Sequence, residues 1–158
     1  MVKAVIQFLV SILVSFAAGA IGSIFTSPSI PTWYAALKKP SFTPPGALIG
    51  SVWSVLYLLM GIAAFLVWRK GLDQPAVRTA LIIFVIQLAL NALWSIIFFG
   101  QHQLLLALVE IVLLWLAILL TIIKFFPISP LAGWLMIPYI LWVSFATFLT
   151  YTVWSLNR

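Results

Sequence analysis

Five long apolar runs, each about as long as a membrane-spanning helix, dominate this sequence. A helix needs about 20 residues, at 1.5 Å per residue, to cross roughly 30 Å of hydrocarbon. The runs lie at about residues 5–25, 46–68, 79–99, 103–125 and 131–156. We therefore predict an all-α membrane protein, with residues 1–158 forming a single five-helix transmembrane domain and the lipid bilayer as its surroundings.

The composition excludes most other classes of protein. Only 6% of the residues are charged, whereas a soluble domain carries roughly a quarter. The eight Lys and Arg residues give a net charge of +6, but they are scattered at the ends of the apolar runs, so we expect no nucleic-acid partner. The absence of Cys excludes disulfides, and a single His and two acids argue against a metal site.

The first run follows Lys3 and is similar to the apolar part of a signal peptide. It is too long for one and lacks a convincing cleavage site, so we expect a retained helix. Its small residues are spaced four apart, which permits close helix contact. We expect these pairs to serve packing inside the monomer, with a dimer interface as the alternative; they are Ser15 with Gly19 and Ala18 with Gly22.

The segment between the first two runs, residues 26–45, is rich in proline and aromatic residues. We expect its prolines to break any continuous helix; they are Pro28, Pro31, Pro40, Pro44 and Pro45. Residues 32–38 would then form two helical turns at the membrane interface, with Trp33 and Tyr34 at headgroup depth. Because loops of this length are commonly functional, we predict that the segment is a lid.

The charges at the ends of the runs predict an orientation. Five spans place the termini on opposite sides of the membrane. The positive-inside rule then favours a cytoplasmic N-terminus and an external lid. The N-terminal face would carry Lys3, Arg69, Lys70, Arg78 and Lys124, and the lid face Lys38, Lys39 and Arg158.

Three of the runs carry polar and aromatic side chains at helical spacing. Buried amides need partners in lipid, so these stripes should face the bundle interior, where the indoles could line a cavity for a planar ligand or simply pack. We expect Pro138 to kink the last helix, and we assign Trp68 and Trp154 to the interfacial belt. The stripes are Trp53, Tyr57 and Met60; Gln87, Asn91, Trp94, Ser95 and Phe98; and Pro138, Trp142, Ala146 and Thr150, with Tyr139 nearby.

Glu110 is the only acid inside a run. An ionisable residue at membrane depth is a candidate for function, and a proton-coupled transporter would depend on it; a hydrated or hydrogen-bonded structural role is the alternative. We expect His102 to be a solvated turn residue. No hydrolytic arrangement and no Gly-rich phosphate loop is present.

Four segments together resemble one family of membrane proteins. They are WYAALKKPSFTPPG (Trp33 to Gly46), which is followed by Trp53, Tyr57 and Met60; LALNALWSIIFFG (Leu88 to Gly100); ALVE (Ala107 to Glu110); and PYILWVSFATFL (Pro138 to Leu149). In this order, and over nearly the whole chain, they are similar to the TspO/MBR family of tryptophan-rich sensory proteins and mitochondrial translocator proteins.

The resemblance implies a five-helix bundle, commonly a homodimer, with a ligand cavity beneath the first loop. Family members bind porphyrins such as protoporphyrin IX, isoquinoline-type synthetic ligands and, in animals, cholesterol. The porphyrin would be a ligand or substrate, with no intrinsic cofactor. Some bacterial members degrade protoporphyrin IX in light, which would make Trp53 and Trp142 catalytic in a photochemical sense. The ligand-binding residues would be Tyr34, Pro44, Trp53, Asn91, Trp94, Trp142 and Ala146.

The end of the fifth run departs from the family's sterol motif. Here Leu149-Thr150-Tyr151 is followed by Trp154-Ser155, and Arg158 misses the required spacing. The resemblance therefore implies a bacterial-type, porphyrin-directed protein of the bacterial cell membrane, acting in tetrapyrrole regulation or stress response. The alternative is a carrier or sensor of small apolar ligands without chemistry.

Overall fold

The computed structural model describes all residues 1–158 and contains helices and no strands. Five helical stretches are long and apolar enough to cross a membrane, which confirms the predicted fold class. The elements are α1 (Val2–Ser29), the single π-helical turn η1 (Ile30–Tyr34), α2 (Gly46–Trp68), α3 (Pro75–Ser95), the π-helical turn η2 (Ile96–Gly100), α4 (Leu104–Phe125), α5 (Pro130–Leu135) and α6 (Ile137–Leu156).

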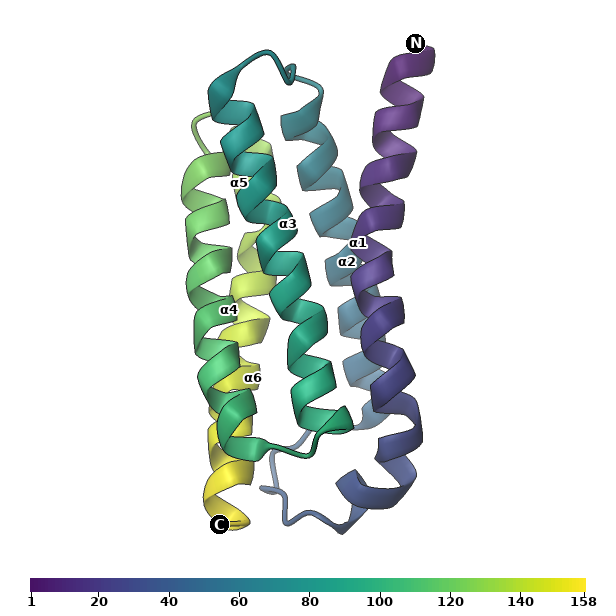
Figure 1. The fold of residues 1–158 in the computed structure, drawn as a ribbon, viewed down its shortest axis with the longest axis vertical. Coiled ribbons are helices and arrows are strands. Elements are labelled where there is room, and N and C mark those ends of the chain that lie inside the picture. Colours follow the sequence, from purple (N-terminus) through teal and green to yellow (C-terminus); the bar gives the residue numbers. More distant parts are fainter.

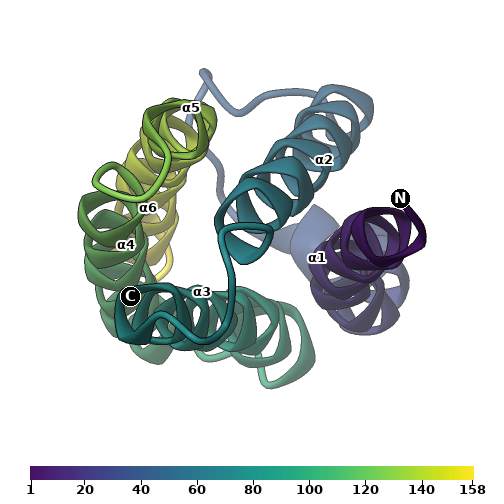
Figure 2. The same cartoon turned by 90° about the horizontal axis from the view of Figure 1, so that it is seen from above.

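The helices run up and down, with the two termini at opposite ends of the bundle (Figure 1). α1 packs against α2 and α3, α3 against α4, α4 against α6, and α2 against α5. Figure 2 shows this order around the bundle axis, with α1 and α4 on opposite sides. The loop of residues 37–45, which joins η1 to α2, crosses the end of the bundle where the C-terminus lies.

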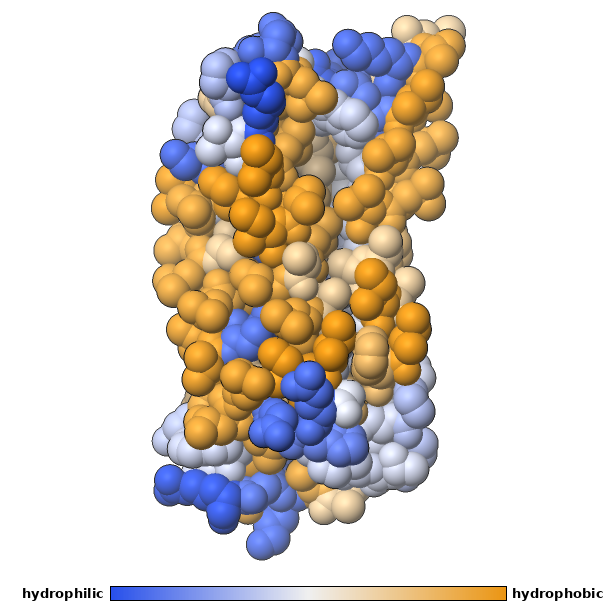
Figure 3. Space-filling view, in the orientation of Figure 1, coloured by the Kyte–Doolittle hydropathy of each residue, from blue (hydrophilic) through white to orange (hydrophobic).

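The surface matches a bilayer. On the face shown in Figure 3, a broad apolar band covers the middle of the molecule and most hydrophilic residues lie toward its two ends. Large apolar side chains such as Leu13 and Leu141 are 68% and 64% exposed. Lipid tails would cover this band, so its exposure costs nothing in a membrane.

The inner face of α1 is polar or small, whereas its outer face is apolar. Its buried residues are Gln7, Ser11, Ser15, Ala18, Gly22 and Ser29. Small side chains let helix backbones approach each other closely in lipid. A Cβ added at Gly19 would lie 2.5 Å from the Tyr57 ring, and one at Gly22 would lie 2.9 Å from the Ser95 hydroxyl. The small residues therefore serve packing within the monomer, as predicted.

The expected break after the first run is wrong. α1 continues through Pro28 to Ser29, and η1 carries the helical chain to Tyr34 and on to residue 36. Residues 32–36 therefore end the first helix instead of starting an interfacial one. Pro31 lies in the first turn of η1, where the wider π-helical turn accommodates a ring that an α-helix would reject. The Thr32 hydroxyl also donates to the Pro28 carbonyl over 3.0 Å, which helps to satisfy the backbone there.

The bounds of the other helices agree more closely with the ranges predicted from the sequence. α3 begins at Pro75, four residues before the expected start at residue 79, and the π-helical turn η2 ends this helix at Gly100. The last span divides at Met136 into α5 and α6, and Pro138 occupies the first turn of α6. The interruption expected from Pro138 is therefore present, two residues before the proline.

Candidate ligand-binding site

A chain of hydrogen bonds crosses the bundle interior and joins α2, α3 and α6. The Tyr57 hydroxyl donates to Asn91 Oδ1 over 2.6 Å, and Asn91 Nδ2 donates to the Tyr139 hydroxyl over 2.8 Å. Tyr139 in turn donates to Gln87 Oε1 over 2.9 Å, and Gln87 Nε2 points at Met60 Sδ over 3.7 Å. All five side chains are buried, so each polar group finds its partner inside the protein.

The chain of hydrogen bonds follows from the helical spacing of its residues on α3 and α2. Gln87 and Asn91 lie one turn apart on the same face of α3, and Tyr57 and Met60 lie one turn apart on α2. An amide left without a partner in hydrocarbon costs several kcal/mol. The hydrogen bonds therefore set how α2, α3 and α6 are rotated about their own axes.

Tyr139, and not Pro138, is the inward residue at the start of α6. Tyr139 is fully buried and Pro138 is exposed. The stripe predicted for the fifth span, which begins at Pro138, therefore starts on the rim of the bundle and not in its centre. Of that stripe, Trp142 and Ala146 are half-buried and Thr150 is buried.

Trp53 rests on this hydrogen-bonded group. Its indole stacks on the Tyr57 ring at 5.6 Å between ring centres and meets the Tyr139 ring edge-on at 6.1 Å. Both phenol rings are held by Asn91. The orientation of Trp53 therefore depends on hydrogen bonds that it does not itself make.

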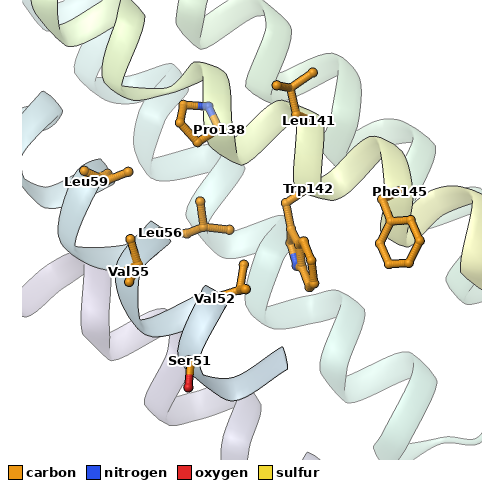
Figure 4. A pocket seen from close by; sticks show the side chains of 9 residues that line it. All are labelled: Ser51, Val52, Val55, Leu56, Leu59, Pro138, Leu141, Trp142 and Phe145. Atoms are coloured by element: carbon orange, nitrogen blue, oxygen red, sulfur yellow. The ribbon is translucent and has the colours of Figure 1, made fainter. Parts of the chain in front are cut away.

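A cavity of about 580 Å³ lies between α2 and α6. The Trp142 side chain points from α6 into the space between the two helices (Figure 4), and its indole N–H is buried without a partner. The cavity opens toward the lipid side, since Val55 and Leu141 in its wall are exposed. Its lining residues are Ser51, Val52, Val55, Leu56, Leu59, Pro138, Leu141, Trp142 and Phe145.

The loop of residues 37–45 reaches this cavity through Phe42. The Phe42 ring stacks on Phe148 at 5.5 Å and meets Phe145 at 6.4 Å. Phe145 lies 5.5 Å from Trp142, and both line the cavity. An aromatic row thus joins the loop to the cavity wall. Phe42 was not among the site residues predicted from the sequence, although it lies between two prolines in the segment predicted to be a lid.

Tyr34 and Trp94 belong to a second aromatic group at the loop end of the bundle. Trp94 stacks on Phe98 at 4.8 Å, and Tyr34 lies 6.3 Å from the same ring. Lys39 Nζ donates to the Tyr34 carbonyl over 2.7 Å and lies 4.7 Å from the Tyr34 ring centre. The loop is therefore tied to η1 as well as to α6.

The predicted site residues thus fall into three places. Trp53 and Asn91 meet at Tyr57, Trp142 lines the cavity, and Tyr34 and Trp94 meet at Phe98. Ala146 is half-buried one turn after Trp142, and Pro44 is half-buried in the loop; neither lines the cavity. The sequence had not identified Tyr57 and Tyr139 as partners of Asn91, or Gln87 as a partner of Tyr139.

His102 does more than occupy a turn. Its backbone has a positive φ of 57°, and its imidazole stacks on Trp33 at 4.2 Å with an angle of 12° between the rings. His102 is exposed, as expected. The stack joins the turn before α4 to the end of the first helix.

The fold and the cavity define a multi-pass integral membrane protein with an apolar cavity that includes a tryptophan. Residues 11–155 match the TspO/MBR family, and the chain belongs to that family. It is 41% identical over 154 residues to the Tryptophan-rich protein TspO of Archaeoglobus fulgidus, covering 97% of this chain and 98% of that protein.

Two further relatives extend the comparison. The chain is 42% identical over 140 residues to the human Translocator protein, covering 87% of this chain and 82% of the relative. It is 41% identical over 140 residues to Protein CrtK of Rhodobacter capsulatus, covering 89% and 86%. The family resemblance drawn from the sequence motifs is therefore confirmed over nearly the full length.

Proposed function

We propose that this protein binds a planar, apolar tetrapyrrole such as protoporphyrin IX in the cavity between α2 and α6. The observation that carries the proposal is an apolar cavity of about 580 Å³ with the Trp142 indole in its wall. Such a volume falls in the range of roughly 300–1,000 Å³ that holds small-molecule ligands. The indole supplies a stacking face for a flat aromatic macrocycle.

We further propose that the bound porphyrin is degraded in light. The cavity wall carries one hydroxyl, that of Ser51, and no acidic or basic side chain, so the reactivity would come from the excited porphyrin itself. Trp142 in the wall and Trp53 on the Tyr57 ring are the indoles available to exchange an electron with it. Dioxygen would be the oxidant that is consumed.

Illumination of the purified protein with protoporphyrin IX tests this reaction. The Soret absorbance should fall in the wild type and persist when Trp53 and Trp142 are both changed to Phe. Trp134→Phe is the matched control, because Trp134 is 64% exposed and does not line the cavity. Wild-type loss in the Trp53→Phe/Trp142→Phe protein would rule out the photochemical role.

Binding without chemistry is the second candidate function. The phenols and the amide next to Trp53 already hydrogen-bond one another, which suits a rigid binding wall in a carrier or sensor. This function predicts saturable quenching of Trp fluorescence by protoporphyrin IX and an unchanged porphyrin spectrum after illumination. The same experiment therefore separates the two functions.

Isoquinoline-type ligands, which are also flat and apolar, would compete for the same cavity.

We place the protein, as a homodimer, in a bacterial cell membrane with its N-terminus in the cytoplasm. Since the chain has no cysteine, single substitutions such as Lys38→Cys and Lys70→Cys allow the orientation to be tested by labelling of intact cells. Reagent added outside the cells should label the Lys38→Cys protein and should not label the Lys70→Cys protein.

A further inference from the structure

Glu110 is buried in the bundle without a partner. It belongs to the inward stripe of α4, together with Ala107, Ile111 and Leu114. The residue is 4% exposed, and neither carboxyl oxygen accepts or donates a hydrogen bond. A polar group in this position costs several kcal/mol unless something binds it. The bundle interior therefore contains an unused hydrogen-bond acceptor.

Glu110 lies between two separate apolar clusters. On α4, Ile111 belongs to the large cluster that fills most of the bundle, and Ala107 belongs to a small cluster near the loop end. On α3, Trp94 packs against both clusters. Glu110 and Trp94 thus mark one layer of the interior, which we call the intermediate layer.

The intermediate layer also contains an unused donor. The Trp94 indole N–H is buried without a partner, as is the Trp142 indole N–H on α6. The only other buried polar side-chain atoms without partners are the hydroxyls of Ser15 and Ser29 on α1. Both serines lie on α1, which packs against α2 and α3.

The other intramembrane amides and phenols contrast with these groups. Asn91, Gln87, Tyr57 and Tyr139 satisfy one another in the hydrogen-bonded chain. Glu110 is not part of that hydrogen-bonded chain. The amides and phenols are thus paired within the folded protein, whereas one carboxyl and two indole N–H groups have no hydrogen-bond partner in it.

We propose that Glu110 is a specificity-determining residue that accepts a hydrogen bond from an N–H group of the bound ligand, while a tryptophan indole of the bundle interior donates to an acceptor on the same ligand. A carboxyl offers an acceptor oxygen in either protonation state, and an indole offers only a donor. The matching ligand is a flat, apolar heterocycle with an N–H beside a carbonyl, as in a lactam. The inference rests on the proposed function in placing a planar ligand within the bundle, and it adds a contact with Glu110 of α4, which is not among the residues that line the cavity between α2 and α6.

A matched pair of ligands tests this role without porphyrin or light. The probes are isoquinolin-1(2H)-one, which has a lactam N–H, and its 2-methyl derivative, which has none. Calorimetric titration of the purified protein should show about tenfold tighter binding of the N–H compound, the worth of one buried hydrogen bond. Equal affinities, or no binding of either compound, would overturn the proposal.

Two variants at position 110 connect the preference to this carboxyl. Glu110→Leu removes the acceptor, so the ratio of the two affinities should fall to about one. Glu110→Gln keeps an acceptor oxygen and should keep most of the preference. A ratio in Glu110→Leu equal to that of the wild type would refute the assignment to Glu110.

Infrared difference spectra of the wild type supply a readout that does not depend on the folding of a variant. The chain has only two acidic side chains, Asp73 and Glu110, and Asp73 is exposed. The N–H compound should shift the carboxyl band of the buried Glu110 in the wild type, and the 2-methyl compound should not. No shift with the N–H compound would count against the proposal, even where porphyrin is bound and degraded as proposed above.

Discussion

The side chain of Asn157 holds the backbone of Lys38 on both sides. Asn157 Nδ2 donates to the Lys38 carbonyl over 2.9 Å, and Asn157 Oδ1 accepts from the Lys38 N–H over 3.0 Å. The same Nδ2 donates to the Val153 carbonyl over 2.7 Å. One amide at the end of α6 thus fastens the start of the loop that reaches the cavity, across 119 residues of sequence.

Asn157→Ala should release this loop. Two hydrogen bonds to Lys38 are lost, each worth about 0.5–1.5 kcal/mol. Backbone amides of residues 37–45 should therefore exchange with deuterium several-fold faster. Thr152→Val is the control, because the Thr152 hydroxyl bonds only within its own helix, to the Phe148 carbonyl. Equal exchange in the two variants would show that Asn157 does not hold the loop.

Phe42→Ala should speed ligand release. It removes the ring that joins the loop to Phe145 and Phe148 beside the cavity, so we expect the dissociation rate of bound protoporphyrin IX to rise about tenfold, as for the loss of a well-packed aromatic pair. Phe8→Ala is matched in exposure, at 37% against 44%, but contacts Phe65 at the other end of the bundle. A similar rate in both variants would exclude a lid role for Phe42.

Tyr139→Phe should destabilise the bundle. The hydroxyl accepts from Asn91 and donates to Gln87, so its removal leaves Asn91 Nδ2 and Gln87 Oε1 without partners, at a cost of about 1–3 kcal/mol each. The temperature of unfolding in detergent should fall clearly. Tyr151→Phe removes a hydroxyl from an exposed ring on the same helix, and its unfolding temperature should equal that of the wild type. Loss of stability in both variants alike would contradict this role of the hydrogen-bonded chain.

Gly61→Ala should weaken the packing of α1 on α2. A Cβ at Gly61 would lie 2.6 Å from Ile12 Cδ1 and 3.0 Å from its Cα, so α1 must move, at a cost of about 1–3 kcal/mol. Gly50→Ala on the same helix is the control, since nothing lies within 4 Å of its new Cβ and alanine favours helix by about 1 kcal/mol. Unfolding in a denaturing detergent should rank Gly50→Ala at or above the wild type and Gly61→Ala below it. The reverse order would disprove close α1–α2 packing.

The positions of the helices were predictable because a membrane span is a local property. About 20 apolar residues must become helical in hydrocarbon, whatever their neighbours are. α4, predicted at residues 103–125, forms at Leu104–Phe125, and α2 forms at Gly46–Trp68 as predicted. The same local rule failed at Pro28, which lies within α1, and at Pro31, which the wider π-helical turn η1 accommodates.

By itself, the sequence determined the five spans, the inward stripe of α3 and the family, because each of these depends on residue type and spacing along the chain. Only the tertiary structure decided that Tyr139 points inward and not Pro138, that Asn91 bonds two phenols from different helices, that Phe42 reaches the cavity and that Glu110 remains without a partner. Periodicity marks a helical face only where polar and apolar residues alternate, and an apolar helix in lipid has no such contrast. The partner of a buried polar group depends on which neighbouring helix face meets it, and that is settled by packing.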